Sequence, residues 1–254
     1  MELSTVLLLG GFSIFVGVLI GGVGIGGVLL VPVLTYVLGL EIHVAIAAAM
    51  FGYIFIGIIG ATIYARHGSI QWSTALWMIA GATPAAFLGS MVASFVPAQG
   101  LELIISLFIL LAGFNALRRR AAVDGERDIT NPLALIAIGV VTGVGSALTG
   151  TGGPLFVVPI MVSLKVAAHA AIGFSQAVQA PLASLATVGN FLYGTVDIFV
   201  GGIIAIGLVF GGIIGAKLAH VVSPSVLKRL VAWVLVAVGV FIIVRLLLNL
   251  NLFA

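Results

Sequence analysis

Long apolar runs separated by short polar breaks set the pattern of this chain. Several runs approach the roughly 18–25 residues that a helix needs to cross the hydrocarbon core of a bilayer. Because lipid offers no partner to exposed backbone N–H and C=O groups, these runs predict helices rather than strands. The predicted helices cover residues 4–20, 28–39, 42–65, 70–95, 99–117, 132–142, 155–164, 166–192, 197–220 and 225–250.

Two glycine-dense stretches interrupt this pattern about half the chain apart. Residues 21–32 read GGVGIGGVLLVP and residues 145–159 read GSALTGTGGPLFVVP. Glycine lets the backbone leave a helix without a Cβ clash, and irregular backbone inside a membrane is tolerated only when it packs in protein or lines a cavity. The stretches therefore predict broken or re-entrant helices.

The two stretches belong to an internal duplication with a constant offset of 126 positions. This offset aligns Gly24, Gly26 and Gly27 with Gly150, Gly152 and Gly153, and further along it aligns His43 with His169. The polar segment RRRAAVDGERDITN separates the halves. We predict a first membrane repeat at residues 1–120, a cytoplasmic linker at 121–130 and a second membrane repeat at 131–254.

The positions of lysine and arginine indicate how the halves are oriented. If the chain turns back at each glycine stretch, one face of the membrane receives all of the basic residues except Arg245, as the positive-inside rule requires. That face carries Arg66, Arg118, Arg119, Arg120, Arg127, Lys165, Lys217, Lys228 and Arg229. We therefore predict inverted repeats with both termini outside. Whether the glycine-rich elements are re-entrant hairpins or pairs of tilted crossings stays open.

Composition supports the membrane interpretation and removes several other functions. Of 254 residues, 62% are hydrophobic and 7% are charged, and the mean hydropathy is +1.38, so we predict an all-α polytopic protein that crosses the cell inner membrane several times. Ten lysines and arginines are too few for a nucleic-acid surface. The chain has no cysteine, and the predicted spans contain no carboxylate pair, metal-ligand cluster or nucleophile and base. We expect no enzyme activity, no metal and no cofactor.

The glycine stretches are the candidate binding site. The helices that follow them begin near Val28 and Leu155, where unpaired N–H groups and the positive end of the helix dipole favour an anion. Backbone at the breaks and nearby polar side chains form the candidate substrate-binding set: Gly24, Gly26, Gly27, Gly150, Gly152, Gly153, Ser146, Thr149, Thr151, Gln176, Gln179 and Tyr53. The alternative is that the glycines serve only close helix packing, as expected for the ladder Gly207, Gly211 and Gly215.

Amides and histidines add two further candidates with open alternatives. Gln176, Gln179 and Asn190 lie within apolar helices, where they either face a cavity or form hydrogen bonds between helices. His43 and His169 either carry a coupling proton or anchor helix ends at the interface.

The glycine motifs also resemble those of a known family. The segments GVGIGGVLLVP and GTGGPLFVVP, the duplication, and the following AIAAAMFG and AIGFSQAV segments are similar to the sulfite exporter TauE/SafE family of membrane transporters. The resemblance implies export or uptake of a small sulfur-containing anion, such as sulfite or a sulfonate, driven by an ion gradient. Pro154 departs from the family pattern, which often has a third glycine at this position.

The leading hypothesis is a secondary transporter that binds its anion near the midplane and rocks one repeat against the other. Its partners would be the lipid bilayer, the anion, and a coupling proton or sodium ion. An anion channel and a non-transporting membrane scaffold are the alternatives. Substrate identity, direction and oligomeric state stay open.

Overall fold

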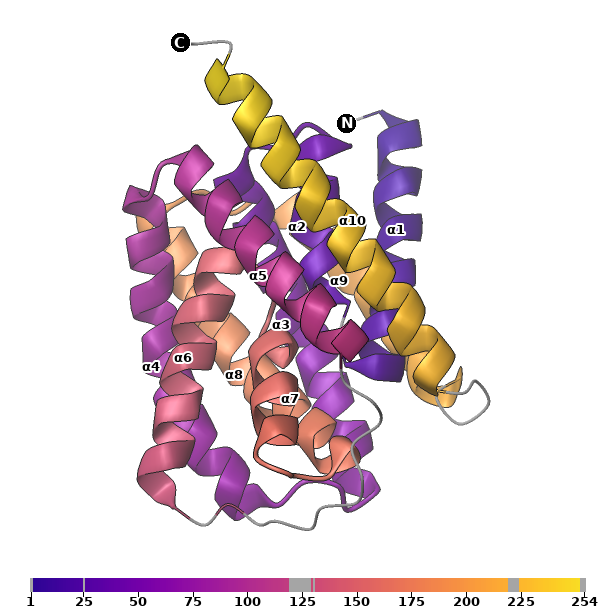
Figure 1. Cartoon of the computed structure of the whole chain (residues 1–254), viewed down its shortest axis with the longest axis vertical. Helices are drawn as coiled ribbons and strands as arrows, with labels where there is room; N and C mark the ends of the chain where they lie inside the picture. The colour runs from indigo at the N-terminus through magenta and orange to yellow at the C-terminus, as the bar shows by residue number, and fades with distance from the viewer. Residues whose placement is uncertain (1, 25, 119–128, 130, 219–223, 252–254) are drawn as a thin grey trace.

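The computed structural model describes residues 2–24, 26–118, 129, 131–218 and 224–251, and this part of the chain contains helices but no strand. Most of the predicted linker lies outside the described residues. The elements, shown in Figure 1, are α1 (Leu3–Val23), the 3-10 turn η1 (Gly27–Leu29), α2 (Leu30–Tyr36), α3 (Ile42–Arg66), α4 (Trp72–Phe95), α5 (Ala98–Arg118), α6 (Pro132–Thr149), α7 (Pro154–Ser163), α8 (Ala168–Tyr193), α9 (Ile198–Leu218) and α10 (Pro224–Asn251).

The described elements fall into two series with the same spacing. Helices α8, α9 and α10 each begin 126 positions after α3, α4 and α5, since 168 − 42, 198 − 72 and 224 − 98 all equal 126. Helix α6 extends to Thr149 rather than ending at residue 142 as predicted, because Gly143 and Gly145 stay helical and the first left-handed residue is Gly150.

The outer surface of the protein is apolar and suited to contact with lipid. Five of the described helices are long and apolar enough to cross a membrane. Large apolar side chains are exposed on the outside, for example Leu3, Phe95 and Leu133 at 74%, 76% and 77%. Exposing so many large apolar side chains to water would be unfavourable. The chain is therefore an all-α polytopic membrane protein, as predicted.

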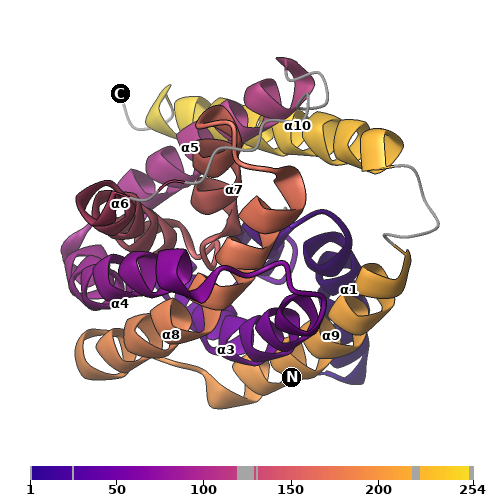
Figure 2. The same cartoon turned by 90° about the horizontal axis from the view of Figure 1, so that it is seen from below.

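The main packing contacts divide the helices into two bundles, each containing helices from both halves of the sequence. Helix α9 packs against α1 and α3, and α4 packs against α6 and α8. The contact between α3 and α8 joins the two bundles, while α5 and α10 pack together across one side of the molecule (Figures 1 and 2). The packing therefore does not keep the two sequence halves apart as separate units.

Close contacts fix the relative directions of these helices. Gly57 and Gly60 of α3 meet Ala180 and Gln176 of α8, so these two helices run antiparallel.

In the α1 and α9 pair, residue numbers rise together along the contact, so the helices run parallel. Gly10 lies nearest Ile203, and Gly211 and Gly215 lie against the backbone of Ile14 and Val18. This contact confirms the predicted packing role of the glycine ladder. The beginning of α1 and the end of α10 lie toward the same end of the molecule (Figure 1).

Candidate functional site

Left-handed glycines end α1 and α6 in matching ways. Gly24 has φ 73° and donates its N–H to Ile20 O at 2.9 Å. Gly150 has φ 65° and donates its N–H to Ser146 O at 2.8 Å. Positive φ is readily accessible to glycine and costly for other residues. The duplicated glycines thus stop both helices at equivalent positions.

After each stop the chain turns back along the helix it has just left. A Cβ placed on Gly26 would lie 2.6 Å from Leu19 Cβ, and one placed on Gly153 would lie 3.8 Å from Thr142 Cγ2. The helices that follow are short. Helix α7 has 10 residues, which rise about 15 Å, or half the thickness of the hydrocarbon core. The helix is therefore broken and the chain turns back at both glycine-rich elements, as the sequence predicted.

The two turns meet inside the protein. A Cβ on Gly27 would lie 2.8 Å from Tyr53 Oη and 2.9 Å from the carbonyl oxygen of Thr151 in the other turn. A Cβ on Gly150 would lie 2.5 Å from Val31 Cγ2 of α2. These positions are buried. We refer to the region around this contact, which comprises Gly24, Gly26, Gly27 and Val28 on one side and residues 150–154 on the other, as the glycine junction.

Tyr53 of α3 connects the two sides of the glycine junction. Its hydroxyl donates a hydrogen bond to Gly27 O at 2.7 Å. Its ring lies against Gly152, whose Cβ, if present, would be 2.7 Å from Tyr53 Cδ2. Because the hydroxyl proton is already donated to a backbone carbonyl, Tyr53 has a structural role in this conformation and holds the two turns together.

Gln179 of α8 is the polar side chain with the most unused hydrogen-bonding capacity at the junction. It is fully buried, and neither its Oε1 nor its Nε2 has a hydrogen-bond partner among the described residues. Nε2 lies 3.0 Å from the position of a Cβ on Gly152. Leaving a buried polar group unpaired lowers stability by about 1–3 kcal/mol. A residue with this cost is expected to serve a function, such as binding a ligand.

Gln176 lies one turn away and does not join Gln179 at the junction. Its side chain packs against Gly60 of α3, where it lines a cavity of about 10 Å³ with Tyr64 and Gly21. Its Oε1 is buried and has no partner in the part of the chain that the structure describes. Sequence reasoning missed Gly60, whose lack of a side chain makes room for Gln176.

The hydroxyls of the second turn differ in what they can still donate. Thr149 Oγ1 donates to Gly145 O at 2.7 Å and lies 3.0 Å from Thr151 Oγ1. Since Thr149 has a single hydroxyl proton, Thr151 is the donor in the second contact. Ser146 Oγ is buried without a described partner. Ser146 is therefore the hydroxyl with unused donor capacity near this turn.

The buried interior is uncharged in the regions that the structure describes. The buried polar residues in the described regions are serine, threonine, glutamine and asparagine, with no acidic side chain among them. The described residues also contain no group of three potential metal ligands. A ligand at the junction would meet neutral hydrogen-bond donors and the N-terminus of α7, whose first residue, Pro154, lacks an N–H.

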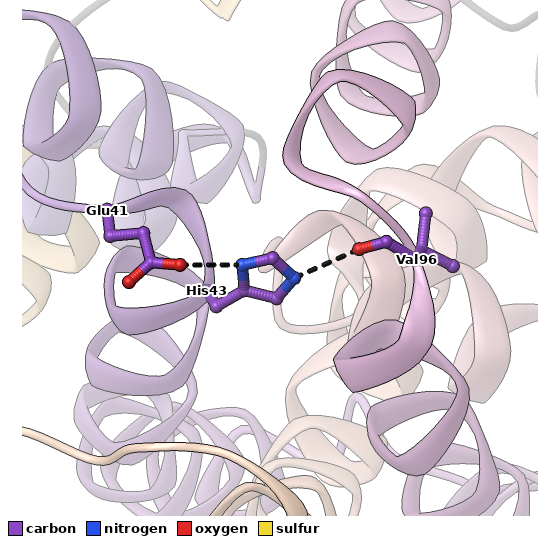
Figure 3. Close-up of polar contacts among 3 residues, drawn as sticks. All are labelled: Glu41, His43 and Val96. Atoms are coloured by element: carbon purple, nitrogen blue, oxygen red, sulfur yellow. Dashed lines mark hydrogen bonds and ion pairs between the residues drawn. The ribbon is translucent and has the colours of Figure 1, made fainter.

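The structure places His43 away from the junction. Its Nε2 lies 3.0 Å from Val96 O at the end of α4 and its Nδ1 lies 3.3 Å from Glu41 Oε1 (Figure 3). Ten residues of helix separate it from Tyr53, a distance of about 15 Å along the axis. This geometry favours the anchoring alternative. The side chain of His169 lies outside the described part of the structure.

These features define a class: polytopic α-helical membrane proteins in which two glycine-rich helix breaks meet in the buried interior. Residues 7–242 match the family model described as sulfite exporter TauE/SafE. The chain belongs to this family and is a membrane transporter.

Curated relatives are similar along most of their length. The probable membrane transporter protein YdhB of Bacillus subtilis is 28% identical over 84% of this chain and 89% of its own. A probable membrane transporter protein of Xylella fastidiosa (strain 9a5c) is 26% identical over 96% and 97%. The probable membrane transporter protein MJ0441 of Methanocaldococcus jannaschii is 27% identical over 93% and 96%. No solved structure matches the chain.

Proposed function

We propose that this protein is a secondary transporter that moves a small sulfur-containing anion, sulfite or an organosulfonate, across the cell inner membrane. The observation that carries the proposal is the unpaired amide of Gln179 beside the glycine junction. The family description, sulfite exporter, supports the choice of substrate class. Coupling to a proton or sodium gradient is part of the proposal.

The chemistry of the junction fits a small oxyanion. The amide of Gln179 can donate two hydrogen bonds and the hydroxyl of Ser146 one, while the N-terminal end of the α7 dipole adds partial positive charge. Sulfite and sulfonates present three oxygen acceptors close together. Neutral donors bind such an anion without the strong Coulomb attraction of lysine or arginine, so release stays possible on the far side of the membrane.

We also propose that the two halves are inverted repeats. The antiparallel contact of α3 with α8 supports this proposal, because these helices occupy equivalent positions in the two series. Exchanging the halves also converts the α1 contact with α9 into the α6 contact with α4, and both contacts are among the largest in the molecule. Alternating access would then consist of rocking the bundle of α1, α3 and α9 against that of α4, α6 and α8.

Uptake by reconstituted vesicles tests the proposal. Vesicles that contain the protein should accumulate labelled sulfite or an organosulfonate in a saturable manner when a proton or sodium gradient is imposed, whereas protein-free vesicles should not. Flux that rises linearly with anion concentration and ignores the gradient would instead identify an anion channel. If no anion of a panel that includes thiosulfate is taken up, and a stable protein partner copurifies, the scaffold alternative replaces the proposal.

A further inference from the structure

Four buried polar side chains lie along one face of α8. Gln176, Gln179, Thr187 and Asn190 are 1%, 0%, 4% and 8% exposed. Their spacings of 3, 8 and 3 residues place them within about 80° of each other around a helix with 3.6 residues per turn. We call these four residues the α8 polar stripe.

Each member of the stripe has at least one buried polar atom with no hydrogen-bond partner among the described residues. These atoms are Gln176 Oε1, both amide atoms of Gln179, Thr187 Oγ1 and Asn190 Nδ2. Two serines of the same helix behave differently, because Ser175 and Ser184 donate to the backbone of α8 at 2.7 and 2.8 Å. Polar residues that join helices need partners on the neighbouring helix. The five stripe atoms named above have no such partner in the part of the chain that the structure describes, so helix association does not explain them.

The stripe is long enough to connect the junction with an end of the molecule. Fourteen residues separate Gln176 from Asn190, which corresponds to about 21 Å along the helix, or two-thirds of a hydrocarbon core of about 30 Å. At one end Gln176 lines the cavity beside Tyr64. At the other end the N–H of Gly194, where the chain leaves α8, donates to Asn190 O.

The offset of 126 positions relates the two ends of the stripe. It carries Tyr64 and Gly60, which line the cavity, onto Asn190 and Ala186, and it carries Ile20 of the cavity wall onto Ser146. All three counterparts are buried. If the halves are inverted repeats, the region around Asn190 is the closed counterpart of the cavity around Gln176.

We propose that the α8 polar stripe lines the route by which a hydrated solute moves between the glycine junction and the two faces of the membrane. Thr187 and Asn190 line the part of the route that is closed in this conformation. This inference rests on the proposed transport function for its cargo. The route itself requires only that water and a small polar solute reach Thr187.

Thiol labelling tests the route directly, because the natural chain has no cysteine. Thr187→Cys and Asn190→Cys variants in membrane vesicles would be treated with a water-soluble anionic methanethiosulfonate. Val188→Cys is the matched control, since Val188 is adjacent in sequence and 45% exposed on the apolar exterior, where the reagent does not dissolve. We expect Thr187→Cys and Asn190→Cys to react at least ~10-fold faster than the control, because thiolates react in water and not in hydrocarbon.

The thiol-labelling experiment and the anion-uptake experiment can fail independently. Thr187→Cys as unreactive as Val188→Cys would overturn the route even if sulfite is transported. Rapid labelling of Thr187→Cys in a protein that moves no sulfur anion would uphold the route and overturn the proposed substrate. If the cysteine variant does not fold, the near-isosteric Thr187→Val serves instead. It should lower the maximal uptake rate and leave the half-saturating concentration unchanged, and an unchanged rate would overturn the route.

Discussion

Gly24 and Gly150 end their helices with φ angles of 73° and 65°, yet the residues around these two turns differ in polarity. Ser146, Thr149 and Thr151 flank the second turn, whereas Ile20, Val23 and Ile25 occupy the corresponding positions of the first. Tyr53 of α3 corresponds to Gln179 of α8. The duplication has thus kept the backbone turn and changed the side chains. The first half supplies Tyr53, which holds the two turns together. The second half supplies the polar side chains with unused hydrogen-bonding capacity.

The largest effect is expected from removing a glycine that both turns need. Gly152→Ala should abolish anion uptake and lower the melting temperature, because the new Cβ would strain a residue at φ 74° and meet the Tyr53 ring at 2.7 Å. Gly39→Ala is the matched control, since Gly39 has φ 71° and no neighbouring atom within 4 Å. The control should lose only about 1–2 kcal/mol to backbone strain. Equal uptake by the two variants would show that the turn does not need its close contact with Tyr53.

Replacing the amide of the second half should separate stability from function. Gln179→Leu removes a buried amide that has no described partner, so the free energy of unfolding should rise by about 1–3 kcal/mol, while uptake is lost. Thermal unfolding and vesicle uptake measure the two quantities. A variant that is less stable than the natural protein would indicate that Gln179 is a structural hydrogen-bonding residue.

The corresponding change in the first half should have the opposite sign. Tyr53→Phe removes the hydrogen bond to Gly27 O, which still accepts a hydrogen bond from the N–H of Leu30. The free energy of unfolding should therefore fall by about 0.5–1.5 kcal/mol, the net contribution of one hydrogen bond. Uptake should persist at temperatures where the variant is folded. Complete loss of uptake by a folded Tyr53→Phe variant would place the tyrosine hydroxyl in the transport chemistry and weaken the contrast between the halves.

The smallest effect is expected at His43. His43→Gln removes the ring contacts with Val96 O at 3.0 Å and with Glu41 Oε1 at 3.3 Å, in which the side chains are 25% and 69% exposed. Exposed pairs contribute about 0–1 kcal/mol, and the glutamine amide can replace the hydrogen bond to Val96 O. The half-saturating concentration for the anion and the dependence on the imposed gradient should stay unchanged. Loss of gradient dependence with intact anion binding would make His43 the coupling residue after all.

Much of this fold could be predicted because the bilayer imposes strong rules on a chain. Apolar runs predicted the helices to within a few residues, and the glycine stretches predicted the helix breaks. The end of α6 was missed, because Gly143 and Gly145 resemble helix-breaking residues in sequence but pack closely against α4 and Phe156 in the structure.

Other features depend on contacts between segments far apart in the sequence. The interleaving of the two halves into bundles follows from helix packing, which the apolar pattern does not specify because most of these helices are apolar all round. The separation of Gln176 from Gln179 arises from their different neighbours, which are Gly60 of α3 for Gln176 and Gly152 of the second turn for Gln179. Threonine is common in membrane helices, so the residue type alone did not single out Thr187. Its helical spacing with Gln176, Gln179 and Asn190 could have done so.

Anion-dependent thermal stability of the purified protein and of Gln179→Leu tests the central claim most directly. A ligand that binds only the folded state stabilises it by about 2.7 kcal/mol at a hundredfold excess over Kd. Sulfite or an organosulfonate should therefore raise the melting temperature of the natural protein and leave that of Gln179→Leu unchanged. An equal rise in both proteins would contradict the account, because the anion would then bind without the amide at the glycine junction.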